Sequence, residues 1–213
     1  MLARRSIVQT SYLVTSTPIP EHDASNGWED VAGEFIAARE QSSIGVDVVR
    51  AWARNLPSGA AILDLGCGTG VPISRLLIEN GFRIYGVDAS HTLVAEFHRR
   101  FPQMSVACES VETSAFFGRS FDGVVAIGLM FLLPADVQRS LIFRVASALN
   151  SGGHFLFTSP SQICTWADLM TGRESCSLGE DVYSSLLSEA GLVLVGNDTD
   201  EGESYYFHAT KQR

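Results

Sequence analysis

Apolar runs and amphipathic stretches alternate along the chain from residue 60 onward. In most of the amphipathic stretches apolar residues recur every three or four positions, and glycine or proline marks the segment ends. This alternation predicts a doubly wound α/β sheet of parallel strands with helices on both faces. Five runs have the length of strands: 61–65, 83–87, 105–108, 121–127 and 154–158.

The C-terminal part of the chain departs from this alternation. A predicted helix at 182–190 is followed by two strand-like stretches, 192–196 and 205–210, joined through the acidic, glycine-containing segment 200–203. Two strands joined in this way form an antiparallel hairpin. We therefore expect a mostly parallel seven-stranded sheet with a terminal antiparallel hairpin.

The segments that flank this core are less regular. Residues 1–26 lack periodicity, and we interpret them as a flexible N-terminal arm, or as a lid that orders on binding. The periodicity of residues 27–56 predicts helices that are interrupted near 41–45. We expect these helices and the core at 60–213 to form a single domain, 27–213. Residues 159–179 are expected to be a long loop, and loops of that length are commonly functional.

Composition narrows the class of protein. The 213 residues are 46% hydrophobic and 18% charged, with a formal net charge of −9. This charge repels phosphate backbones, so we expect no nucleic-acid partner. No apolar stretch approaches the roughly 18 residues of a bilayer span, and the N-terminus carries no clean signal sequence. We therefore expect a cytoplasmic protein without a membrane partner.

Cysteine usage agrees with that compartment. Cys67, Cys108, Cys164 and Cys176 form no C-x-x-C pair, and we expect reduced thiols rather than a disulfide framework. Clusters of His, Cys and Asp at metal-ligand spacing are also missing from the sequence, so no metal is predicted. The sequence leaves the oligomeric state open.

A glycine turn after the first predicted strand carries the chemistry. The segment 62–65 leads into Gly66-Cys67-Gly68-Thr69-Gly70. Glycine permits positive φ and leaves no side chain between backbone and ligand. The helix that follows presents free N–H groups. A second acid, Asp88, closes the next strand, where a carboxylate can accept hydrogen bonds from a ribose.

This arrangement resembles the class I S-adenosylmethionine-dependent methyltransferases, whose first motif is an acid, an apolar residue and G-x-G-x-G. The resemblance implies a Rossmann-like fold, S-adenosylmethionine as cofactor and methyl transfer by in-line displacement. One alternative is an NAD(P)- or FAD-dependent oxidoreductase, although its G-x-G-x-x-G fingerprint places the third glycine one residue later. Another is a non-catalytic adenosylmethionine-binding protein, because no catalytic side chain is evident.

The resemblance also implies a set of cofactor contacts. Asp64 would meet the methionine ammonium, directly or through water, and Asp88 the ribose hydroxyls. Glu109, or the backbone of Ser110 and Val111, would meet the adenine amino group. The backbone of the glycine turn and the ends of strands two and four would complete the site. Those further residues are Gly66, Cys67, Gly68, Ala89, Ser90, Ala126 and Ile127.

The methyl acceptor is expected to be a small molecule. Residues 129–133 form an apolar wall without a visible nucleophile or base, so the catalytic residues stay unknown. Two segments can supply the acceptor pocket: the N-terminal helix, with Trp28, Phe35 and Arg39, and the 159–179 loop, with Trp166, Asp168, Arg173 and Glu174. As acceptor-binding residues we predict Trp28, Arg39, Phe131 and Trp166.

Overall fold

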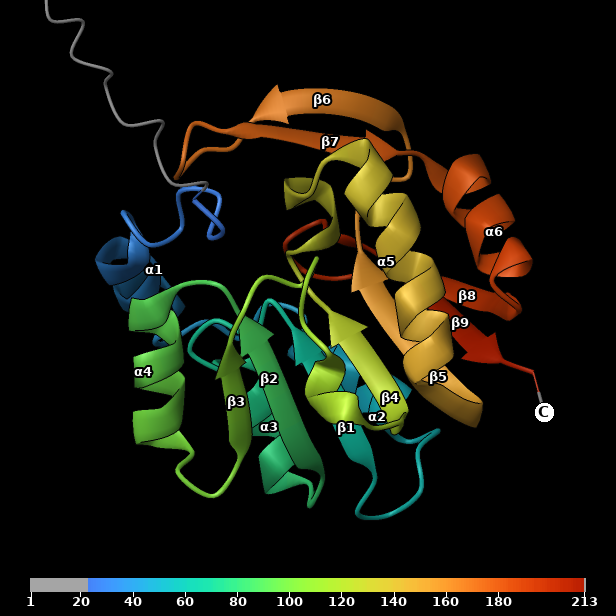
Figure 1. Ribbon diagram of the computed structural model, residues 1–213, viewed down its shortest axis with the longest axis horizontal. Coiled ribbons are helices and arrows are strands. Elements are labelled where there is room, and N and C mark those ends of the chain that lie inside the picture. The colour runs from blue at the N-terminus through green and yellow to red at the C-terminus, as the bar shows by residue number, and fades with distance from the viewer. Residues whose placement is uncertain (1–22, 213) are drawn as a thin grey trace, which may run out of the picture.

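The computed structural model describes residues 23–212, which form a seven-stranded sheet flanked by helices (Figure 1). The strand order is β3-β2-β1-β4-β5-β9-β8, with β1 to β5 parallel and β9 antiparallel to both of its neighbours. The predicted sheet and terminal hairpin are confirmed. The strands are β1 Ala61–Leu65, β2 Arg83–Asp88, β3 Ser105–Cys108, β4 Phe121–Ala126, β5 Leu149–Thr158, β8 Leu192–Thr199 and β9 Tyr205–Lys211.

Helices cover both faces of this sheet. One core cluster joins the sheet to α5 and α6, and the other joins it to α2, α3 and α4. Successive residues of β1 serve the two clusters, since Ile62 packs in one and Leu63 in the other. The helices are α1 Ala32–Arg39, α2 Val46–Ala53, α3 Ile73–Glu79, α4 His91–Arg100, α5 Ala135–Ala148 and α6 Glu180–Glu189, with 3₁₀ turns η1 Phe116–Gly118 and η2 Met130–Leu132.

The centre of the sheet positions the site. β1 and β4 are hydrogen-bonded neighbours, and their inner residues, such as Leu63 and Val124, are completely buried. The chain passes from β1 to β2 on one side and from β4 to β5 on the other. Strand order therefore reverses between β1 and β4, and ligands of open α/β sheets bind beyond the carboxyl ends of the strands at such a point.

The segment expected to be a loop at 159–179 is instead largely a β-hairpin, so that prediction was wrong. β6 Ile163–Ala167 pairs with β7 Glu174–Leu178. Figure 1 shows this hairpin across one end of α5, with its turn beside the first described residues. The buried positions of β7 include Ser175 and Ser177. Because these inward residues are polar, the sequence shows no apolar alternation there.

Strand β5 is also longer than predicted. α5 ends at Ala148, and β5 begins at once, so that Gly152 and Gly153 lie inside the strand rather than stopping the helix. The register of β5 against β4 shifts there. A Cβ on Gly153 would lie 2.9 Å from the Asn150 carbonyl oxygen, which explains why glycine occupies this irregularity.

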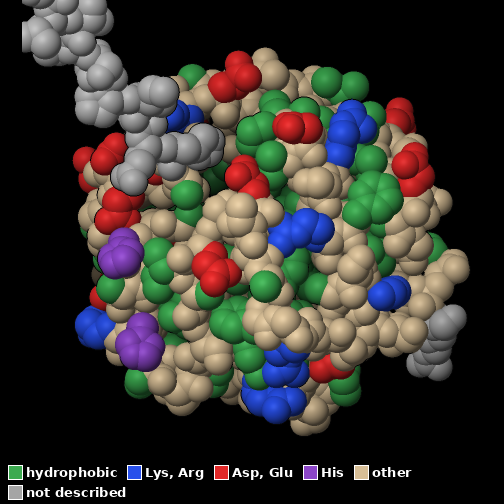
Figure 2. Space-filling model, in the orientation of Figure 1, with side chains coloured by type: hydrophobic (Ala, Val, Ile, Leu, Met, Phe, Trp, Pro, Cys, Tyr) green, Lys and Arg blue, Asp and Glu red, His purple; other side chains and the backbone are tan. Residues whose placement is uncertain are grey.

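Three properties of the described residues bear on the earlier expectations. The four cysteines are free thiols. Between residues 23 and 212, no helix combines the length and apolar character needed to cross a bilayer. On the face shown in Figure 2, acidic and basic side chains are interspersed and do not form one continuous charged patch.

Candidate active site

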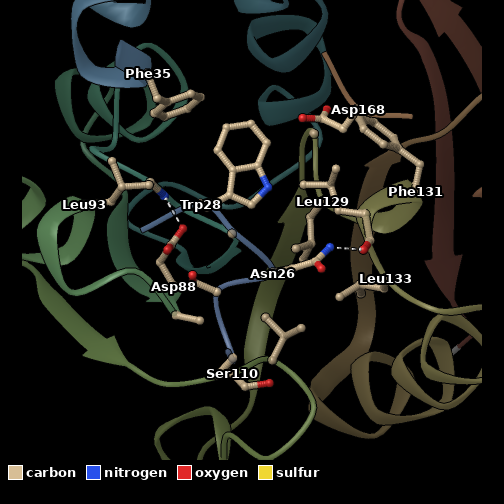
Figure 3. A pocket seen from close by; sticks show the side chains of 18 of the residues that line it. Asn26, Trp28, Phe35, Asp88, Leu93, Ser110, Leu129, Phe131, Leu133 and Asp168 are labelled. Atoms are coloured by element: carbon tan, nitrogen blue, oxygen red, sulfur yellow. Dashed lines mark hydrogen bonds between the residues drawn. The ribbon is translucent and has the colours of Figure 1, made fainter. Parts of the chain in front are cut away.

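A cavity of about 320 Å³ lies at the carboxyl ends of β1 and β4. Its wall combines the glycine turn, the end of β2, the loop after β3 and the segment after β4. Residues 23–28, two side chains of α1 and Asp168 of the β6–β7 hairpin close it (Figure 3). The first described residues and a hairpin turn far along the chain therefore meet over the sheet edge.

The glycine turn presents bare backbone to this cavity. Gly66 and Gly68 have φ of 68° and 52°, values that favour glycine. A Cβ on Gly66 would lie 3.1 Å from Leu129, and one on Gly68 would lie 3.1 Å from Phe35. The Gly66 N–H donates to the Val87 carbonyl at 2.8 Å, which ties the turn to the end of β2.

Asp88 joins this turn to the next loop. Its Oδ2 accepts from the Gly68 N–H at 2.8 Å, and its Oδ1 accepts from the Ser90 N–H at 2.9 Å. Each carboxylate oxygen keeps a second lone pair with which it can accept another hydrogen bond. Burial raises the pKa of this half-buried carboxyl above its ordinary value. Asp88 lines the cavity, as the sequence predicts for a ribose ligand.

Asp64 lies next to the glycine turn, as predicted, but on its buried side. Its side chain is buried behind the glycine turn, and its Oδ2 accepts from the Ser74 hydroxyl at 2.6 Å. Burial, reinforced by the nearby Asp88 charge, raises the pKa of Asp64 to about 7 despite that hydrogen bond. The carboxylate does not belong to the cavity wall formed by the described residues. A direct contact with a ligand ammonium would require the turn to open, and the alternative is a contact through a water molecule.

Four other predicted cofactor residues lie away from the cavity wall. The Cys67 side chain is buried against β2, where a Cβ on Gly86 would meet its Sγ at 2.7 Å. Ser90 caps α4 by accepting from the Leu93 N–H at 3.2 Å. Ala126 is fully buried in the core, and Glu109 is exposed to solvent. The structure corrects the side-chain assignment of Glu109, because the chain turns Ser110 and Val111 toward the cavity instead.

The remaining predicted residues come together, with one exception. Trp166 lines a separate surface groove and reaches the cavity region only through Phe131, whose ring centroid lies 5.5 Å from its own. The predicted residues that line the cavity are Trp28, Arg39, Gly66, Gly68, Asp88, Ala89, Ser110, Val111, Ile127 and Phe131.

Residues 23–26 line the cavity, which agrees with the lid interpretation of the N-terminal segment for these four residues. Asn26 Nδ2 donates to the Leu132 carbonyl at 3.0 Å, and Asp23 forms an ion pair with Arg173 at 3.3 Å. These four residues were assigned to the predicted arm, the rest of which lies outside the described residues. Their contacts join parts of the chain that are remote in sequence, so no local pattern indicates them.

Arg39 supplies the positive charge of the cavity wall. Arg39 is the single cationic residue among the described residues that line it, and it forms no ion pair with any of them. Burial lowers the pKa of Arg39, but a guanidinium stays protonated in proteins. Its charged carbon lies 5.6 Å from the centroid of Phe35, the ring that also faces Gly68. The positive charge of Arg39 therefore lies near the glycine turn.

Trp28 occupies the centre of the site (Figure 3). Its ring meets Phe35 edge to face, with centroids 5.2 Å apart. Its indole Nε1 is buried and has no acceptor among the described residues. In this conformation the ring therefore forms an apolar wall of the cavity and makes no hydrogen bond with the described residues.

Comparison with known proteins agrees with this fold. Residues 62–153 match the sequence profile of the methyltransferase domain family. The chain is 31% identical over 131 residues to demethylmenaquinone methyltransferase of Beutenbergia cavernae, covering 58% of this chain and 53% of that protein. It therefore spans about half the length of that curated relative.

Solved structures extend the likeness to the rest of the fold. CcbJ methyltransferase from Streptomyces caelestis superposes with a TM-score of 0.69 at 14% identity, covering 90% of this chain and 98% of that one. Burkholderia thailandensis 1,6-didemethyltoxoflavin-N1-methyltransferase, solved with its acceptor and S-adenosylhomocysteine, gives 0.65 at 18% identity, covering 93% and 94%. Residues 62–153 thus match a methyltransferase domain, and the chain has the fold of S-adenosylmethionine-dependent methyltransferases.

Proposed function

We propose that this protein transfers the methyl group of S-adenosylmethionine to a small-molecule acceptor. The observation that carries the proposal is that the glycine turn and Asp88 are hydrogen-bonded to each other at the point where strand order reverses. The family match over residues 62–153 supports it. The named relatives methylate small molecules according to their descriptions, which favours the same class of acceptor here.

The cavity wall offers a complementary group for each part of the cofactor. Asp88 would hold the ribose, and Ala89, Ser110 and Val111 the adenine side. The methionine end would lie on the glycine turn, with its carboxylate toward Arg39. Arg39 would thus bind the cofactor and not the acceptor. The cofactor supplies an activated methyl group, so the protein mainly positions the reactants and excludes water.

The acceptor side is partly covered by other segments of the chain, which supports a small substrate. Residues 23–28 and the β6–β7 hairpin cover the cavity, and the ion pair between Asp23 and Arg173 connects them. The net charge of −9 disfavours nucleic acid as the acceptor. We further propose that residues 27–213 act as one domain in the cytoplasm.

Calorimetry with S-adenosylhomocysteine and NAD tests the cofactor first. We expect micromolar binding of S-adenosylhomocysteine and none of NAD, and the reverse result would indicate an oxidoreductase. Labelled methyl transfer into a metabolite extract, a protein extract and total tRNA then tests the acceptor. Label chiefly in protein or tRNA would contradict the small-molecule proposal, and binding without any transfer would support a non-catalytic protein.

A further inference from the structure

Four carboxylates line the cavity among the described residues, and three of them are accounted for. Both oxygens of Asp88 accept backbone N–H groups, and those of Asp23 accept from residues 25 and 27 and from Arg173. Glu112 is exposed beside Ser110, on the side assigned to adenine. The fourth carboxylate, Asp168, has no role in the cofactor site.

Asp168 is held by one oxygen and open at the other. Its Oδ1 accepts from the Met170 N–H at 3.0 Å, the Thr171 N–H at 2.8 Å and the Thr171 hydroxyl at 3.0 Å. Its own N–H donates to the Arg173 carbonyl at 2.7 Å, which closes the hairpin turn. Its Oδ2 accepts from no described residue. The turn thus orients the carboxylate and leaves one oxygen for a ligand.

The surroundings of Asp168 indicate the kind of ligand. Asp168 lines the same cavity as the aromatic rings of Phe131 and Trp28, and Figure 3 shows its carboxylate at the edge of this cavity. Arg173, the cation on the same hairpin, is turned away to Asp23, so no described cation neutralises Asp168. An open carboxylate in a cavity that is also lined by aromatic rings favours a flat group that carries a hydrogen-bond donor, and it repels an anion.

We propose, resting on the proposed function, that Asp168 binds the atom to be methylated, an amine nitrogen or hydroxyl oxygen on an aromatic acceptor. Its Oδ2 accepts the N–H or O–H hydrogen bond. During transfer the nucleophile's lone pair forms the bond to the methyl carbon, and the carbon–sulfur bond breaks with its electron pair on sulfur. The proton of the nucleophile passes to Asp168 Oδ2, which supplies the base that the sequence did not reveal.

Three probes with the same ring test recognition without requiring turnover. We would measure benzylamine, benzyl alcohol and benzoate by saturation-transfer NMR, with and without S-adenosylhomocysteine. The wild type should bind benzylamine at least tenfold more tightly than benzoate, with benzyl alcohol between them. Asp168→Asn keeps an oxygen for the turn but loses the charge, so this preference should fall at least tenfold. Glu174, which the sequence suggested for the acceptor pocket, is exposed on the same hairpin and does not line the cavity, so Glu174→Gln should leave the preference unchanged.

Equal binding of the three probes, no binding, or a preference that survives Asp168→Asn would overturn the assignment. Labelled methyl transfer into a metabolite extract then tests the proton step. Asp168→Asn should be about 10²- to 10⁴-fold slower at neutral pH, with S-adenosylhomocysteine affinity unchanged within twofold. Its rate should rise with pH as the acceptor ionises. A variant as fast as Glu174→Gln would exclude Asp168 as the base. If the wild type does not bind S-adenosylhomocysteine, the proposed function itself would be rejected.

Discussion

Replacing Asp88 should separate the structural part of its role from the proposed ligand contact. The carboxylate accepts N–H groups of Gly68 and Ser90, at 2.8 and 2.9 Å. Asp88→Ala removes both acceptors, and each N–H left without a partner in this half-buried site costs about 1–2 kcal/mol. The sum of about 2–4 kcal/mol corresponds to a fall of roughly 4–16 °C in Tm for a chain of this length.

Asp88→Asn is the sharper variant. Its single carbonyl oxygen keeps one of the two backbone bonds, so we expect about half the loss of stability. A charge-assisted hydrogen bond to a ribose contributes about 1.5–3 kcal/mol, and its loss should weaken S-adenosylhomocysteine binding roughly 10- to 100-fold. Calorimetry well below the variant's Tm measures this affinity, and thermal unfolding measures the stability.

Asp122 provides a matched control at the opposite end of the sheet. Its carboxylate also accepts a backbone N–H, from Ala61 at 2.9 Å, and a side-chain amide from Asn150. Asp122→Asn should therefore lower Tm without changing affinity. If Asp88→Asn binds S-adenosylhomocysteine as tightly as Asp122→Asn does, the ribose assignment is wrong, whatever happens to stability.

Three further predictions concern the turn, the hairpin and pH. Gly68→Ala and Gly118→Ala should each lose about 1–2 kcal/mol from positive φ, but only Gly68→Ala, whose Cβ meets Phe35 at 3.1 Å, should weaken S-adenosylhomocysteine binding in calorimetry; equal affinities would remove the glycine turn from the site. Tyr183→Phe deletes a buried hydroxyl that donates to Gln138 at 2.5 Å and accepts from the Leu178 N–H at 3.2 Å, so chemical unfolding should show a loss of about 2–4 kcal/mol, and a loss below 0.5 kcal/mol would contradict this. Burial lowers the pKa of His208 to about 4, and the charge of the neighbouring His154 is a further cause. Between pH 6.5 and pH 4 the unfolded chain therefore binds a proton that the folded chain does not, so the stability of the fold should be full above pH 6.5 and decline toward pH 4. His208→Gln should show a smaller difference in Tm between pH 7 and pH 5 than the wild type.

The sequence by itself determined the features that depend on neighbouring residues. Apolar runs of strand length, separated by helical periodicity, specify a parallel sheet because each element must bury one face or both. The glycine turn and Asp88 follow directly from strand ends, so their position at the carboxyl edge was predictable. The antiparallel end of the sheet followed equally from the short acidic turn at 200–203.

Only the tertiary structure decided which of the candidate residues face the cavity. Asp64 follows the same local rule as Asp88, yet it lies in the central strand and is buried behind the turn with Ser74. The upper wall depends on a contact between Asp23 and Arg173, 150 residues apart in the chain. The hairpin that carries Asp168 buries serines, so periodicity could not reveal it. Contacts between such distant segments arise from packing and ion pairing over the finished sheet, and no local pattern encodes them.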